Sequence, residues 1–130
     1  MGQQQLLLII LGVIIVGIAI AVGLSLFSAQ SVQSNRDAII NDLNNLAAQA
    51  YQFRIRPSSM GGGQGDYATF TIPNKMKTNE NGTYVITTAG STSAGIVITA
   101  TSAQNASNTI KVTIDTDGKL GTWVYTGDFQ

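Results

Sequence analysis

The chain contains no cysteine and no histidine, and each absence excludes a class of chemistry. Without cysteine there is no disulfide, no thiol nucleophile and no thiolate metal ligand. Without histidine the usual general base is missing, so the many Ser and Thr hydroxyls have no imidazole to activate them. The Gly-rich stretch at residues 61–65 lacks the Lys and Ser/Thr of a phosphate-binding loop. We therefore predict no enzyme, no catalytic residue, no metal and no cofactor.

Charged residues are also few. Seven basic and seven acidic side chains give the 130 residues a net charge of zero. The basic residues are scattered along the chain, so the electrostatic footprint of a nucleic-acid-binding protein is missing. Nucleic acid is therefore not predicted as a partner.

Apolar sequence is abundant at the beginning of the chain. Residues 6–24 contain no charge, amide or hydroxyl group, and a helix of this length, at about 1.5 Å per residue, matches the roughly 30 Å core of a bilayer. No Lys or Arg precedes this segment, and the first charged residue is Arg36. Secretory signal peptides open with a basic region, and plain anchors normally keep basic flanks. We therefore expect a chain from which a leader has already been removed.

The helix is expected to continue in amphipathic form. The apolar positions that follow the i, i+3, i+4 spacing of one buried stripe are Val32, Ile39, Ile40, Leu43, Leu46, Ala47 and Ala50. Ser34 and Asp37 match a capping box that could start a new helix, but the periodicity crosses them, so we favour one continuous helix. Pro57 predicts that the helix ends near Arg54, before a flexible Gly-rich loop.

The rest of the chain is typical of short β-strands, because runs of Thr, Val, Ile and aromatic residues alternate with Gly and Asn clusters. We expect strands at residues 67–72, 83–88, 95–101, 109–114 and 120–126. Ile110, Val112 and Ile114 alternate with polar residues, which indicates an antiparallel sheet with one buried face. Asp117-Gly118 is a typical hairpin turn between the last two strands.

These elements predict an α+β fold, in which a long N-terminal α-helix packs on a small antiparallel β-sheet. The apolar stripe of the helix would cover the apolar face of the sheet. The expected parts are an apolar helix at residues 1–27, its amphipathic continuation at 28–56, a Gly/Ser-rich loop at 57–66 and a β-sheet domain at 67–130.

An apolar N-terminal helix, an amphipathic continuation, a Gly-rich loop and a Thr-rich C-terminal sheet together resemble a mature type IV pilin or pseudopilin. The resemblance covers the whole chain in architecture, whereas sequence likeness is confined to roughly the first 27 residues. It implies the major structural subunit of a cell-surface filament, a helical homopolymer that is fed from an inner-membrane precursor pool. It also implies a prepilin peptidase and pilus assembly machinery as partners.

The sequence departs from the family at three places. The family has Glu at position five where this chain has Gln5, and the family's C-terminal cysteine pair and the Pro of its apolar segment have no counterparts. In the family that Glu is thought to pair with the amino terminus of a neighbouring subunit. If the resemblance holds, these departures indicate a divergent branch of the pilin family.

The resemblance places filament assembly on the first part of the helix. The residues implied to form the filament core are Met1, Gln5, Leu6, Leu7, Leu8, Ile9, Ile10, Leu11, Val13, Ile14, Ile15, Val16, Ile18, Ile20, Val22 and Leu24. Met1 is also the implied position of N-methylation. Gly12, Gly17 and Gly23 would permit local unwinding in a filament, although Gly is in any case tolerated in membrane helices.

Alternatives stay open for the function and for three smaller features. The chain could instead be a pseudopilin of a type II-like secretion system, or a single-pass membrane-anchored extracytoplasmic binding module. Asp115 and Asp117 are candidates for a calcium site, against the alternative of a β-turn whose Asp side chains bond to their own backbone. Asn81 and Asn105 lie in glycosylation patterns that are frequent by chance in an Asn/Thr-rich chain.

Overall fold

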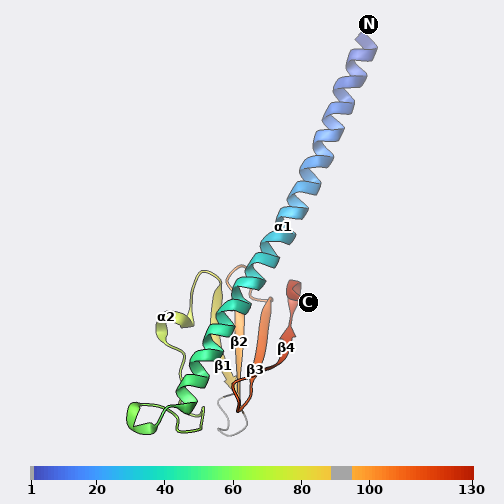
Figure 1. Cartoon of the computed structure of the whole chain (residues 1–130). Helices are drawn as coiled ribbons and strands as arrows, with labels where there is room; N and C mark the ends of the chain where they lie inside the picture. Colours follow the sequence, from blue (N-terminus) through green and yellow to red (C-terminus); the bar gives the residue numbers. More distant parts are fainter. Residues whose placement is uncertain (1, 89–94) are drawn as a thin grey trace. The chain divides into compact units, whose positions relative to one another are not determined.

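The computed structural model describes residues 2–88 and 95–130 and has an α+β fold. Its largest element is a single helix, α1 (Gly2–Ile55). By its contacts the chain divides into two compact units, Met1–Gln33 and Ser34–Gln130. The first unit consists of the N-terminal part of α1, with its apolar segment, and the second unit holds the rest of α1 and the sheet (Figure 1).

The helix is continuous, as favoured from the sequence. Ser34 and Asp37 both lie inside α1, so the capping-box pattern does not start a new helix. No proline interrupts the segment, and every residue can therefore donate its backbone N–H to the helical ladder. The helix ends one residue beyond the predicted Arg54, two residues before Pro57.

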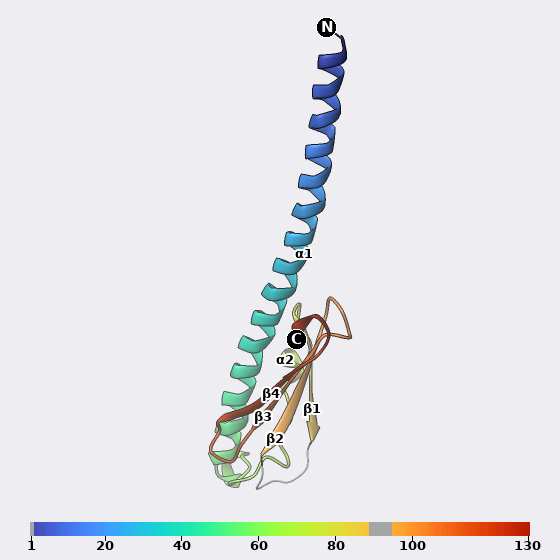
Figure 2. The same cartoon turned by 90° about the vertical axis from the view of Figure 1, so that its right-hand side faces the viewer.

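The second unit contains a four-stranded antiparallel sheet in the order β1-β2-β3-β4. The strands are β1 (Gly82–Thr88), β2 (Ile96–Ser102), β3 (Thr109–Ile114) and β4 (Leu120–Tyr125), which confirms four of the five predicted strands. In β2 and β3 buried residues alternate with more exposed ones, as a sheet with one covered face requires. The part of α1 within this unit lies along the covered face in two perpendicular views (Figures 1 and 2).

The core of this unit is formed by the helix stripe and the inner face of the sheet. Ile39, Leu43 and Leu46 on α1 are fully buried, as are Ile98 and Ile110 on the sheet. Burial of each such side chain contributes about 1.5–3 kcal/mol relative to full exposure. The stripe is narrower than predicted, because Val32 and Ile40 remain half-exposed.

The predicted strand at residues 67–72 is wrong. This stretch is a loop that buries its aromatic side chains: the Phe70 ring packs on Phe53 with centroids 5.5 Å apart, and the Tyr67 hydroxyl donates to the backbone oxygen of Asp115 at 2.7 Å. Strand propensity largely reflects how well a side chain fits a half-buried surface, and a buried loop selects the same residues. A short helix, α2 (Asn74–Lys77), follows the loop and was not predicted.

The Gly-rich loop has a definite structural role rather than that of a flexible connector. The backbone N–H of Gly63 donates to Phe53 O at 2.8 Å and that of Gln64 to Arg56 O at 3.0 Å, so loop amides pair with carbonyls at and just beyond the end of α1. A Cβ on Gly63 would overlap the backbone oxygen of Asp66. The glycine is therefore needed for the close approach of the loop to the helix end.

Candidate functional site

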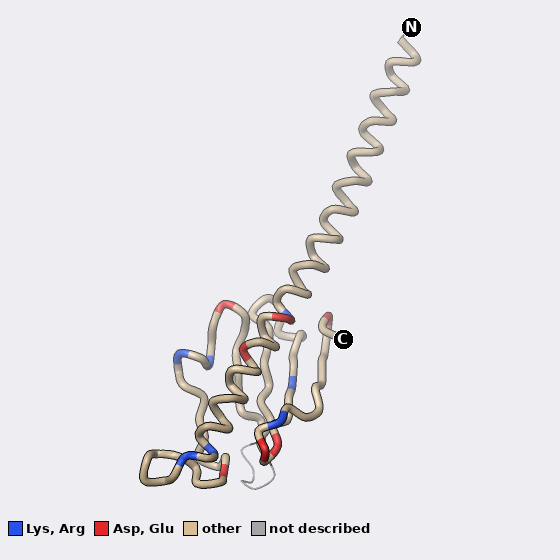
Figure 3. Tube along the Cα trace, in the orientation of Figure 1, with Lys and Arg blue, Asp and Glu red and all other residues tan. Residues whose placement is uncertain are grey.

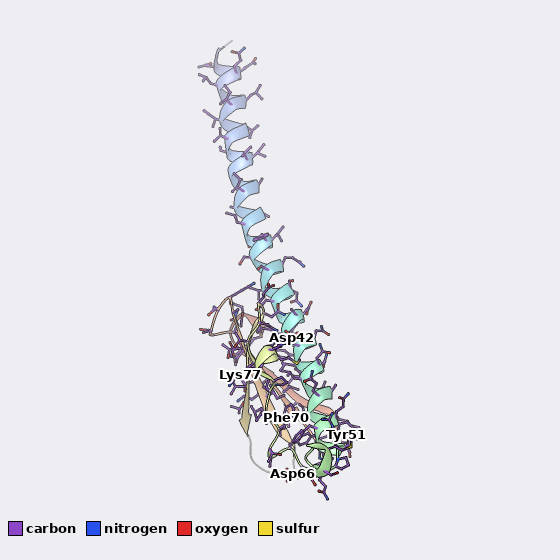
Figure 4. The ribbon with its side chains drawn as sticks, turned by 90° about the vertical axis from the view of Figure 1, so that its left-hand side faces the viewer. Asp42, Tyr51, Asp66, Phe70 and Lys77 are labelled. Atoms are coloured by element: carbon purple, nitrogen blue, oxygen red, sulfur yellow. The ribbon has the colours of Figure 1, made fainter. Side chains whose placement is uncertain are left out.

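The first unit presents an apolar surface on every side of the helix. The fourteen Leu, Ile and Val side chains between residues 6 and 24 are each 52–68% exposed. Figure 4 shows side chains standing out all around this part of α1, and Figure 3 shows no charged residue along it. A helix that is apolar all round belongs in a protein core or in a membrane.

This surface is far too apolar for water. Covering the exposed half of fourteen Leu, Ile and Val side chains corresponds to a gain on the order of 10–20 kcal/mol, at about 1.5–3 kcal/mol for each complete burial. Helix α1 is the one described helix that is long and apolar enough to cross a membrane. Its length and composition suit a membrane anchor or a signal sequence.

The residues implied for filament assembly lie along this helix. Gln5 and the apolar residues from Leu6 to Leu24 are exposed, and Met1 lies outside the described residues. At Gly12, Gly17 and Gly23 an added Cβ would meet no atom within 4 Å, and α1 is unbroken at all three. The glycines therefore leave shallow places on the helix surface without interrupting the helix.

Within the second unit the side chain of Asp42 joins α1 to the sheet. The Asp42 carboxylate accepts hydrogen bonds from the Tyr84 hydroxyl at 2.5 Å, from Asn79 Nδ2 at 2.9 Å and from Asn81 Nδ2 at 3.0 Å. Burial by itself raises the pKa of Asp42, but the three donors outweigh it and leave that pKa below 3.8. Burial, and then the bond to Asp42, raises the pKa of Tyr84. Figure 4 labels Asp42 on the helix.

A second polar contact lies about two helical turns before Asp42. Asn35 is 6% exposed, donates through Nδ2 to the backbone oxygen of Asn81 at 3.0 Å and accepts from the Ser102 hydroxyl at 2.5 Å. Buried polar side chains need such partners, because an unsatisfied one costs about 1–3 kcal/mol. We did not predict these contacts; the available signal was that Asn35 and Asp42 interrupt the apolar stripe of the helix.

Two arginines of α1 lie over aromatic rings. The Arg36 guanidinium is 4.5 Å from the centroid of the Tyr125 ring, which stacks with Trp123, and Arg54 is 5.5 Å from the centroid of Tyr67. Arg54 also donates to the backbone oxygen of Thr116. These contacts are worth about 0.5–2 kcal/mol each and attach α1 to β4 and to the turn after β3.

The calcium candidates form a hairpin turn. The Asp115 carboxylate accepts the backbone N–H groups of Asp117 and Lys119 at 2.9 and 2.8 Å, while Gly118 has φ +81°. This is the arrangement of a β-turn in which Asp bonds to its own backbone. Among residues 2–88 and 95–130 there is no group of three or more acidic side chains that could hold a metal ion.

The two glycosylation candidates differ in their surroundings. Asn81 is half-buried, and its side-chain amide donates to Asp42. Asn105 is exposed, and its Oδ1 accepts the backbone N–H of Ser107 at 3.0 Å. Of the two, only Asn105 presents its side chain on the surface.

The first unit is thus a helix with exposed apolar side chains. In the second unit a sheet covers the apolar stripe of the helix. A long N-terminal apolar helix and a small antiparallel sheet are consistent with a pilin-like fold. Comparison of this chain with known protein families, with curated proteins and with solved structures finds no match.

Proposed function

We propose that this chain is the major structural subunit of a type IV pilus-like extracellular filament. The observation that carries the proposal is the apolar surface of residues 6–24, exposed on every side of the helix. In the filament these helices pack against copies of themselves, while the second units form the outer surface. The role is structural, and it requires no catalytic residue or cofactor.

The same surface suits storage in a membrane before assembly. Lipid tails are about as apolar as Leu side chains, so a helix that leaves the bilayer for a bundle of identical helices exchanges one apolar environment for another. The free energy of the transfer is then set by packing and by contacts of the second unit. The peptidase and the assembly machinery enter the proposal through the resemblance to pilins.

Two other functions make use of the same helix. A pseudopilin of a secretion system would form short assemblies, and a membrane-anchored binding module would form none. The length and composition of α1 suit all three of these functions. The three functions therefore differ in whether long filaments of this subunit exist.

The test is electron microscopy, with antibodies against the second unit, of material sheared from cells that express the full chain. We expect long labelled filaments, and we expect Ile14→Lys to abolish them, because a charge in the middle of an apolar bundle or bilayer costs about 2.5–3.5 kcal/mol. Ile55→Lys is the matched control, since Ile14 is 52% exposed and Ile55 59% exposed but outside the apolar segment.

Variants must be compared at equal amounts of subunit in the membrane. A wild-type chain that is abundant in the membrane but forms no filaments would contradict the proposal and favour the anchor. Filaments of Ile14→Lys in wild-type yield would show that the apolar helix is not the assembly surface.

A further inference from the structure

The sheet of the second unit has two edge strands, β1 and β4. We infer that β4 of one copy pairs with β1 of the next copy, so that neighbouring sheets are joined edge to edge. The inference rests on the proposed function insofar as a filament places copies side by side in the same orientation. Its partner is therefore a second copy of this chain.

Neither edge strand carries a charged residue or a proline. Proteins commonly place charged residues or Pro on edge strands to prevent such contacts. The edge strands here read GTYVITT and LGTWVY, without a charge or a proline. The outward backbone groups of both strands are thus available to another strand, except at the start of β1, where Gly82 bonds Asn79.

Each edge presents one exposed valine, and the two valines match. Val85 of β1 is 48% exposed and Val124 of β4 is 45% exposed. The register places Val85 opposite Thr99, Thr99 opposite Lys111, and Lys111 opposite Val124, so both valines lie in one row on the same face of the sheet. Placed opposite each other across a copy–copy contact, they would cover each other.

The hydrogen-bonding phase of the two strands agrees with this register. The Gly82 carbonyl accepts Asn79 N–H at 3.0 Å on the side away from β2. Every second residue of a strand directs its backbone groups to the same side, so Tyr84 and Ile86 also direct theirs away from β2. Thr126 N–H donates to Thr109 O at 3.0 Å, so Val124 faces β3 and Trp123 faces the free edge. Trp123 would then exchange hydrogen bonds with Ile86 of the next copy.

The register irregularities of β1 and β4 would also lie next to each other in this contact. The ladder is irregular after Ile86 in β1 and before Trp123 in β4. In antiparallel pairing these two irregularities meet at the same end of the contact and leave the segment around the valines regular. At the other end, the bridge between Thr78 and Thr83 already covers the start of β1, which limits the contact to a short stretch.

There is room for a strand beside β1. A groove of about 440 Å³ runs between β1 and the segment before it, lined by Val85 and Ile86 on one side and by Ile72 and Lys77 on the other. Lys77 is exposed there, and Asp128, which follows β4, is also exposed. Antiparallel pairing brings the end of β4 next to the beginning of β1, so Asp128 would approach the exposed Lys77 as well as the exposed Glu80.

The number of strands makes the contact antiparallel. In a meander of four antiparallel strands, the first and the last run in opposite directions. Copies that share one orientation therefore bring β4 next to an oppositely directed β1. This is the more stable of the two ladder geometries.

The experiment introduces cysteines into the full chain, which has none of its own. In a non-hydrogen-bonded antiparallel pair the Cα atoms are about 4.5 Å apart, which permits a disulfide. Filaments of Val85→Cys/Val124→Cys are oxidised with copper phenanthroline and analysed on a non-reducing gel. We expect most of the chain to shift from monomer into a ladder of dimers, trimers and larger species that a reductant collapses.

The matched control is Val85→Cys/Lys111→Cys, because Lys111 is exposed in the same row but lies on an inner strand. Filaments with no more ladder than this control would overturn the edge contact and leave the filament proposal standing. Dimers from Val124→Cys alone would also overturn it, since they indicate a two-fold contact between β4 strands.

The edge contact and the filament proposal can fail separately. If the wild-type chain forms no filaments, or the double variant alone fails to form them, oxidation is carried out on membranes that hold the subunit. A ladder there supports the edge contact without a filament, and its absence overturns the contact.

Discussion

Asp42 shows how a polar side chain on a mainly apolar helix stripe can attach the helix to a sheet. Its carboxylate collects donors from β1 and from the turn before β1, which are 37 to 42 positions away in sequence. Such a partner cannot be read from local periodicity. Tyr84 is fully buried and depends on Asp42 for its hydroxyl, so removal of Asp42 leaves a buried donor without an acceptor.

We predict that Asp42→Ala lowers the free energy of unfolding of the second unit by about 2 kcal/mol at pH 7. Hydrogen bonds to a charged group contribute about 1.5–3 kcal/mol, and the Asp42 carboxylate is partly screened by solvent. Trp123 fluorescence during denaturant unfolding of the full chain in detergent measures the change. Asn44→Ala, at an exposed position of the same helix, is the control and should change stability by less than about 0.5 kcal/mol. Equal effects of the two substitutions would contradict the role of Asp42.

The pH dependence of that difference has a definite sign. The pKa of Asp42 in the folded chain is lowered from its ordinary value of 3.8, so folding favours the ionised form. The stabilisation is therefore fully present well above pH 3.8 and is lost as the pH falls through the lower folded value. The stability gap between wild type and Asp42→Ala should shrink in that acidic range, and a gap that grows there would contradict the sign.

Gln5 is the residue at which the sequence departs from the pilin pattern. A Glu there would attract a neighbouring amino group by about 4 kcal/mol at 4 Å with an effective dielectric constant near 20, offset by desolvation. Gln5 provides only a neutral hydrogen bond, worth about 1 kcal/mol. We predict that Gln5→Ala still forms filaments in sheared fractions. If it abolishes them while the subunit remains stable in the membrane, position five is essential here too.

Helix α1 and strands β1 to β4 could be predicted from the sequence because each has a local signal, either a period or a run of Thr, Val, Ile and aromatic residues between Gly and Asn clusters. The i, i+3, i+4 stripe and the alternation in β3 report which face is buried, and the turn at Asp117-Gly118 marks a hairpin. The loop at residues 67–72 could not be separated from a strand, because its burial depends on partners elsewhere such as Phe53. The apolar segment was evident from composition, whereas the contacts of Asn35 and Asp42 depend on the tertiary fold.

Within α1, the region from Gly12 to Gly23 is the weakest part of the helix. Each Gly costs a helix interior about 1 kcal/mol relative to Ala, and three occur within twelve residues. In the isolated chain the helix is nonetheless unbroken here. If packing in the filament unwinds α1, we predict that it does so in this region.

A filament map at side-chain resolution checks this prediction, with a variant in which all three glycines are Ala as the comparison. We expect broken i to i−4 bonds between residues 12 and 23 in the wild-type filament and a longer continuous helix in the variant. Continuous helical hydrogen bonds from residue 6 to residue 46 in the wild-type filament would refute the unwinding.

At the scale of the whole molecule, the two units differ in whether their apolar side chains are covered within the chain. The second unit covers the apolar stripe of its own helix part with its sheet. In the first unit the Leu, Ile and Val side chains between residues 6 and 24 have no such cover from the described residues, since each is at least 52% exposed. A membrane or other copies must supply the cover, which is why polymerisation and membrane storage are alternative states of the same helix in this account.

The most direct test is a cryo-electron microscopy reconstruction of filaments sheared from cells that express the full chain. We expect a core of closely packed helices in which residues 6–24 contact only copies of the same segment, with the sheets of the second units on the outside. A reconstruction in which residues 6–24 lie outside the core, or a preparation in which the chain remains in the membrane as single copies and no filaments exist, would contradict it.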